Sequence, residues 1–248
     1  MLPDPVFLLV AAMAVILVGL AKGGLSGLGA LGTPLIALVV APVQAAAILL
    51  PILIVQDAVS VWAFRTWDGW VIGWMLPGAL VGILGGWAFA ELVPATAMMA
   101  MLGAITAGFG MWRLWIERGG RAVAASRSPG WVGSLFGVGM GFASQIAHAG
   151  GPPFQMWVAP RKLPHERFVG TGAILFAIVN WAKVPAYLAL GAFDAATVTV
   201  SAALLPLAIA STLAGVWVIR RMSPQRFYVI VYLLMVLLGA KLVWDGIA

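Results

Sequence analysis

The sequence predicts an all-α integral membrane protein of about 8–10 helical segments, in two inverted repeats with broken or re-entrant helices rich in glycine and proline. Hydrophobic residues make up 63% of the 248 residues and charged residues only 9%, whereas soluble chains carry about 25% charged residues. The apolar residues form stretches long enough to cross a bilayer. The two halves of the chain also resemble each other, which is typical of secondary transporters.

The first half, residues 1–116, is predicted to be a membrane repeat of five segments. The first segment, 5–21, follows a leader that carries Asp4 and no basic residue, so we expect a retained span and not a cleaved signal peptide. The second segment, 25–41, is short and rich in glycine, which predicts a broken or re-entrant helix. Three full spans are expected after it, at 44–64, 70–90 and 95–115.

A polar linker at 117–130 separates this repeat from a second one at 131–248. The second repeat is also predicted to hold five segments, of which 150–160 is short, interrupted by proline and expected to be broken. The full set is 131–147, 150–160, 168–190, 195–218 and 226–245.

The basic residues predict the orientation of the chain. If the 117–130 linker is cytoplasmic and the segments alternate sides, 12 of the 14 Lys and Arg residues lie on the cytoplasmic side. Such a bias is typical of a bacterial-type inner (plasma) membrane protein. The remaining two are Lys183 and Lys241. Because the basic residues fall in short loops, the net charge of +6 does not indicate nucleic-acid binding.

Matching motifs in the two halves support the repeat. The stretch 29–34 (GALGTP) pairs with 148–153 (HAGGPP), and Asp68 pairs with Asp194. An odd number of segments per half would make the second copy enter the membrane from the opposite side. Three further positions keep similar spacing, with Pro77, Gly82 and Gly86 matching Pro206, Ser211 and Gly215.

Several glycine-rich motifs resemble the sulfite exporter TauE/SafE family of membrane anion permeases, which includes the 4-toluene sulfonate uptake permease type. The motifs are 22–29 (KGGLSGLG), 32–34 (GTP), 141–144 (GFAS), 148–153 (HAGGPP), 167–171 (RFVGT) and 190–194 (LGAFD). The resemblance implies export or uptake of a small sulfur-containing anion, such as sulfite or an organosulfonate, by a protein that is not an enzyme.

The two breaks are the predicted anion site. An anion crossing hydrocarbon must exchange its water for protein donors, which free N–H groups at helix N-termini can supply. Glycines elsewhere, such as Gly82 and Gly86, are expected only to allow close helix packing. The predicted substrate-binding residues of the breaks are Gly29, Gly32, Thr33 and Pro34 in the first and His148, Gly150, Gly151 and Pro152 in the second.

Ionisable side chains within the spans are costly and therefore candidates for function. Lys183, three residues after Asn180, could bind the substrate, or it could form a structural ion pair with Asp57. Asp57 could carry a coupled proton or only neutralise Lys183. His148 titrates near neutral pH, which suits proton coupling or an anion contact, although it could also be structural.

Weaker candidates are polar residues beside the breaks or the spans that follow them. Of these, Lys22 is expected more as a positive-inside anchor than as a ligand. The full set is Lys22, Ser26, Gln56, Gln145, Gln155 and Thr171. We expect no metal and no cofactor, protons and lipids as further partners, and an oligomeric state that the sequence leaves open.

Two other functions fit parts of the sequence. A passive anion channel or uniporter would share the repeat and the breaks, without needing Asp57 or His148 for turnover. The stretch 24–27 (GLSG) matches the G-x-S-G pattern of intramembrane serine proteases, with Ser26 as nucleophile and His148 as base. The absence of cysteine excludes a thiol nucleophile and a disulfide framework.

Overall fold

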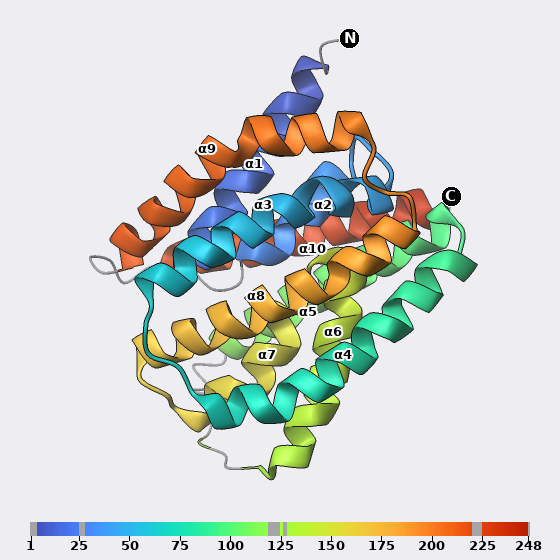
Figure 1. Cartoon of the computed structure of the whole chain (residues 1–248). Coiled ribbons are helices and arrows are strands. Elements are labelled where there is room, and N and C mark those ends of the chain that lie inside the picture. The colour runs from blue at the N-terminus through green and yellow to red at the C-terminus, as the bar shows by residue number, and fades with distance from the viewer. Residues whose placement is uncertain (1–3, 25–27, 119–124, 126–127, 220–224, 248) are drawn as a thin grey trace.

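The structure, a computed structural model, describes residues 4–24, 28–118, 125, 128–219 and 225–247, and the regular secondary structure within them is helical (Figure 1). Each predicted segment corresponds to a helix or to a broken pair of helices. The elements are α1 (Pro5–Lys22), η1 (Leu28–Leu31), α2 (Gly32–Ile36), α3 (Pro42–Ala63), α4 (Gly69–Leu92), α5 (Ala95–Arg118), α6 (Gly130–Ala147), α7 (Gly151–Val158), η2 (Ala159–Arg161), α8 (His165–Ala189), α9 (Ala195–Ile219) and α10 (Gln225–Ile247).

Six helices in the described part of the chain are long and apolar enough to cross a membrane: α1, α3, α4, α5, α8 and α9. Large apolar side chains are exposed on their outer faces, including Leu9, Trp62, Leu84 and Trp181. Lipid tails offer no hydrogen-bonding partners, so such an apolar surface suits contact with the membrane interior. The prediction of an all-α integral membrane protein is therefore confirmed.

Aspartates begin three of the helices. The side chain of Asp4 accepts a hydrogen bond from the backbone N–H of Val6 at 3.0 Å, at the start of α1. Asp68 accepts from two N–H groups in the first turn of α4, and Asp194 accepts from Thr197 at 2.6 Å, at the start of α9. These bonds satisfy N–H groups that have no partner within the helix. At Asp194, outside the spans, they hold the pKa of the carboxyl below its ordinary value.

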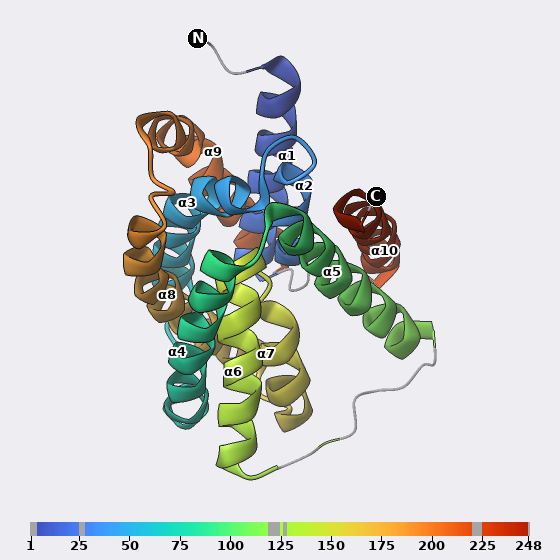
Figure 2. The ribbon, with the colours of Figure 1, turned by 90° about the vertical axis from the view of Figure 1, so that its right-hand side faces the viewer.

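The helices pair mostly between the two halves. Helix α4 packs along α6, α5 packs along α10, and α1 and α3 both pack on α9. Figure 2 shows α5 and α10 side by side, and it shows α1 descending from the N-terminus while α6 starts at the opposite end of the molecule. Helix α8 contacts α3 and α4.

Small residues let these helices touch along their backbones. A Cβ atom added at Gly78 of α4 would lie 1.9 Å from the carbonyl oxygen of Ser134 in α6, and one at Gly82 would lie 2.1 Å from that of Val138. Gly86 is similarly blocked by the side chain of Gln145. The expectation that Gly82 and Gly86 serve close helix packing is confirmed.

The contact between α1 and α9 is built in the same way. A Cβ at Gly19 would lie 2.0 Å from the hydroxyl oxygen of Ser211, and one at Gly23 would lie 2.5 Å from the backbone of Gly215. Ser211 and Gly215 are the residues whose spacing matches Gly82 and Gly86. The matched residues of both halves therefore lie at close helix contacts.

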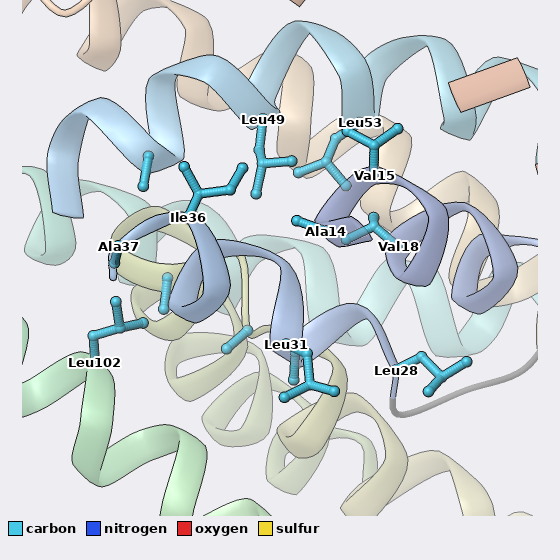
Figure 3. Close-up of a cluster of buried hydrophobic side chains, with 14 of the residues drawn as sticks. Ala14, Val15, Val18, Leu28, Leu31, Ile36, Ala37, Leu49, Leu53 and Leu102 are labelled. Atoms are coloured by element: carbon cyan, nitrogen blue, oxygen red, sulfur yellow. The ribbon is translucent and has the colours of Figure 1, made fainter. Parts of the chain in front are cut away.

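The first break is enclosed by apolar side chains. Leu28 and Leu31 of η1 and Ile36 of α2 are buried against Val18 of α1 and Leu49 of α3 (Figure 3). This packing holds a short and irregular stretch of backbone inside the protein, where lipid cannot reach it.

We expect Gly78→Ala to destabilise the protein by about 1–3 kcal/mol, because its methyl group would overlap a backbone carbonyl of α6 that cannot move alone. Gly73→Ala, on the same helix, is the control, since its Cβ would meet no atom within 4 Å. Thermal unfolding in detergent measures the effect. Equal stability of the two variants would show that α4 and α6 do not need this close approach.

Candidate functional site

A cavity of about 120 Å3 lies between the two halves of the chain. Such a volume holds several water molecules or one small anion. Both breaks contribute to its wall, with Gly29 and Ala30 from the first and His148, Gly151 and Pro152 from the second. The rest of its wall comes from α1, α3, α5, α6, α7 and α8.

The wall of the cavity combines a polar cluster with aromatic side chains. The polar members are Lys22, Ser144, His148, Gln155 and Asn180. The aromatic members are Phe109, Phe154, Phe168 and Phe176. A few polar groups in a mostly apolar wall are typical of small-molecule sites, where they orient the ligand.

Lys22 and Asn180 are joined behind the wall by a buried carboxylate. The ammonium group of Lys22 forms a salt bridge with Oδ1 of Asp57, whose side chain is 1% exposed. The amide of Asn180 donates to the other carboxylate oxygen at 2.5 Å. Lys22 also lies over the ring of Phe176, with its Nζ 4.9 Å from the ring centroid. Asp57 is therefore paired with Lys22 and Asn180 in the described part of the chain, and not with Lys183.

Lys183 is completely buried and fully hydrogen-bonded. Its Nζ lies 3.1 Å from the carbonyl oxygen of Ser144, 3.1 Å from the Ser144 hydroxyl and 2.6 Å from Nδ1 of His148. An ammonium group has three protons to donate, so these three acceptors satisfy it. Lys183 lies behind Ser144 and His148, which line the cavity, and does not itself line it.

The hydrogen bonds of His148 select one form of its ring. Nε2 lies 2.8 Å from the carbonyl oxygen of Ala46, which can only accept, so Nε2 carries a proton. Nδ1 is then free to accept from Lys183. The ring also stacks on Tyr187 at 6.1 Å between centroids. This arrangement links α3, α6 and α8 through one imidazole.

The backbone of His148 is as unusual as its side chain. It has a left-handed conformation, with φ of 51°, and ends α6. The N–H of His148 bonds to Ser144 O at 3.1 Å and the N–H of Ala149 to Ala143 O at 3.2 Å, a pattern in which glycine is usual. A non-glycine residue there is strained. In this conformation the imidazole of His148 faces Lys183.

The charges around the cavity favour an anion. In their ordinary ionised forms, Lys22 and Lys183 carry two positive charges and Asp57 carries one negative charge. The excess of one positive charge lies in surroundings of low polarity, where an ion interacts more strongly than in water. An anion in the cavity would compensate that charge.

The structure brings only part of each predicted break to the cavity. Gly29, Gly151 and Pro152 line it. In α7, Pro152 and Pro153 have no N–H to donate, and the N–H of Phe154 bonds to Gly150 O. This helix start therefore offers the N–H of Gly151. The remaining break residues, Gly32, Thr33, Pro34 and Gly150, are packed beside the wall and do not line the cavity.

The secondary candidates are scattered. Gln155 and Lys22 line the cavity, and Lys22 is the last residue of α1. Gln56 donates to the carbonyl of Val15 at 3.2 Å, and Gln145 is buried on α6. Thr171 of α8 lies beside the α3–α4 connection, and its hydroxyl accepts a hydrogen bond from the N–H of Asp68 at 2.9 Å. Ser26, the nucleophile of the protease hypothesis, lies outside the described residues.

Sequence reasoning missed several residues of the site. Ser144 was visible only as part of the 141–144 motif, although it offers two acceptors to Lys183. Nothing in the local sequence distinguishes Phe176, which faces Lys22, or Tyr187, whose hydroxyl bonds to the Gln145 carbonyl at 2.6 Å. The described residues include no group of His, Asp and Glu side chains that could hold a metal ion.

We expect His148→Asn to destabilise the protein by about 1–3 kcal/mol, because Lys183 and the Ala46 carbonyl both lose a buried partner. Asparagine tolerates the left-handed conformation, so the helix end itself is preserved. Lys162→Asn is the matched control, at an exposed position with φ of 54°. Unfolding temperatures in detergent would contradict the role of the ring if both variants matched the unmodified protein.

Comparison with known proteins identifies the family. The family model described as Sulfite exporter TauE/SafE matches residues 11–242, nearly the whole chain. Searches of curated proteins and of solved structures gave no significant match. Members of this family are membrane transporters and not enzymes. The match includes both breaks and every helix that lines the cavity, and the chain therefore belongs to the TauE/SafE sulfite exporter family of membrane transporters.

Proposed function

We propose that this protein is a secondary transporter that moves a small sulfur-containing anion, such as sulfite or an organosulfonate, across a bacterial-type inner membrane in a proton-coupled cycle. The observation that carries the proposal is the cavity between the halves, lined by Lys22, His148 and Asn180 and surrounded by an excess of positive charge. The family match supports an anion as the substrate. The 117–130 linker lies on the cytoplasmic side in this proposal.

The cavity supplies what a dehydrated oxyanion needs. Lys22, Asn180 and the N–H of Gly151 can donate to its oxygen atoms, and the Ser144 hydroxyl adds a further donor. The phenylalanine rings exclude water from the rest of the space, which strengthens these interactions. Lys183 stabilises the bound anion through its charge and through His148 and Ser144, which it positions.

Alternating access would come from movement of one repeat against the other. Exchange of the two halves turns the α4–α6 contact into the α9–α1 contact, and both are close glycine-lined contacts. The opposite directions of α1 and α6 in Figure 2 agree with an inverted repeat. Because both halves line the cavity, a rocking motion would open it first to one side and then to the other.

Asp57 and His148 are the groups that we propose for proton coupling. Both are held by hydrogen bonds to cationic side chains at the cavity, so a proton on either would change the charge that the anion meets. A passive channel or uniporter would leave these groups purely structural. The difference is measurable as a dependence of flux on the proton gradient.

Sulfite flux into proteoliposomes tests the function. With a pH gradient across the membrane, we expect saturable flux accompanied by a change of internal pH, because the anion and the proton move together. Liposomes without protein are the control. Saturable flux that ignores the gradient would contradict coupling and favour a uniporter, and flux that does not saturate would favour a channel.

Lys183→Met should abolish most transport while leaving the protein inserted, because methionine keeps the apolar stem and removes the buried charge. Loss of one partner of a buried charged hydrogen bond costs about 2–5 kcal/mol, so flux should fall at least about thirtyfold. Lys241→Met on α10 is the control, since this exposed lysine pairs only with the neighbouring Asp245 in the described contacts. Normal flux through the Lys183 variant would remove that residue from the mechanism.

A further inference from the structure

Asp57 accepts hydrogen bonds from the two side-chain donors that an anion in the cavity would need. Lys22 and Asn180 both line the cavity, yet each directs its polar group to a carboxylate oxygen of Asp57. Asp57 itself does not line the cavity and is 1% exposed. A carboxylate that holds both donors from behind the wall competes with any anion in front of it.

We infer that Asp57 is a resident counter-anion, and that a proton on this carboxylate releases Lys22 to bind the transported anion. This inference rests on the proposed transport function and adds to it the ligands, the coupling group and the stoichiometry. The protonated carboxyl can still accept from Asn180 through its carbonyl oxygen, but it no longer provides an ion pair for Lys22. Lys22 then turns its charge to the cavity.

The charge of the cluster supports a ratio of one proton to one monoanion. Before loading, Lys22, Lys183 and Asp57 sum to one positive charge. A proton on Asp57 raises this to two, and a bound monoanion returns it to one. A monoanion alone would compete with Asp57 for Lys22, whereas one proton and one monoanion together free Lys22 and leave the charge of the cluster unchanged. The cycle then moves no net charge across the membrane.

Other titratable groups face Asp57 from the neighbouring helices. In the described part of the chain these are Lys22 from α1 and Lys183 from α8, with His148 at the end of α6 behind Lys183. Both nitrogen atoms of His148 are engaged, one by the Ala46 carbonyl and one by Lys183. An added proton on His148 would point a donor at the Lys183 ammonium. A proton on Asp57 also requires a donor to move away, but Lys22 lines the cavity and has room to do so, whereas Lys183 is completely buried. Asp57 is therefore the better place for the proton.

Uptake of radiolabelled methanesulfonate into proteoliposomes tests this inference. Methanesulfonate keeps one negative charge at every pH used, whereas sulfite itself takes up a proton near neutral pH. With acid outside, we expect the unmodified protein to accumulate it about tenfold per unit of pH gradient, the limit for one proton per anion. A membrane potential imposed without a pH gradient should cause no accumulation.

Asp57→Asn should separate binding from coupling. Its amide mimics a protonated carboxyl, so exchange of labelled for unlabelled methanesulfonate should persist, while accumulation in a pH gradient disappears. Adding Lys22→Gln to this variant should abolish exchange as well. The control is Asp245→Asn, the same chemical change in the exposed Lys241–Asp245 pair, which should behave as the unmodified protein.

The outcomes distinguish this inference from the proposed function. If Asp57→Asn still accumulates methanesulfonate in a pH gradient, or loses exchange, Asp57 is not the counter-anion, although the protein remains a transporter. Accumulation driven by the membrane potential in the unmodified protein would also overturn the inference, independently of whether any variant folds. If the unmodified protein carries neither methanesulfonate nor sulfite in a saturable way, the proposed function fails and the inference fails with it.

Discussion

Backbone hydrogen bonding in lipid is the constraint on which this structure depends. A chain in hydrocarbon has no water to satisfy a broken helix, so irregular backbone survives there only inside protein. Both breaks obey this requirement. The η1–α2 stretch is enclosed by Val18, Leu49 and their neighbours, and the end of α6 satisfies its own carbonyls through the left-handed turn at His148. The cavity exists because two interruptions of this kind are brought together and covered.

Small residues make that covering possible. Apolar side chains interact with lipid tails about as favourably as they interact with one another. Helices in a membrane therefore associate through close packing. Gly78 and Gly82 of α4 allow contact with backbone atoms of α6, and Gly19 and Gly23 of α1 allow it with α9. The resulting frame is close-packed on both sides of the cavity, and its contacts join one half of the chain to the other.

Electrostatics then decide what this frame can hold. Buried charges are tolerated only when they are paired or hydrogen-bonded, and here the pairing is unequal, with two lysines and one aspartate. Lys183 is satisfied by Ser144 and His148, whereas Lys22 depends on Asp57. The excess positive charge destabilises the empty site and favours the binding of an anion. Substrate binding and protein stability are therefore connected through these few residues.

The sequence by itself determined the fold class, the approximate bounds of the long helices and the family. Hydropathy and length specify spans, because a bilayer has one thickness and one solvent character, and a proline or a run of glycines specifies where a helix is interrupted. Aspartate before an apolar run, as at Asp68, could have marked a helix start as well, because only local N–H groups are involved. The same local reasoning correctly assigned Gly82 and Gly86 to helix packing.

Only the tertiary structure decided which polar residues meet. The sequence suggested Lys183 as the partner of Asp57, but the fold pairs Asp57 with Lys22, 35 residues away, while Lys183 bonds to Ser144 and His148. Helical periodicity shows which residues share a helix face, but it carries no information on the rotation of one helix against another. That rotation is set by the glycine contacts of α1 and α9 and of α4 and α6. For this reason the residue types at the cavity could be predicted from the sequence, whereas the hydrogen bonds between them could not.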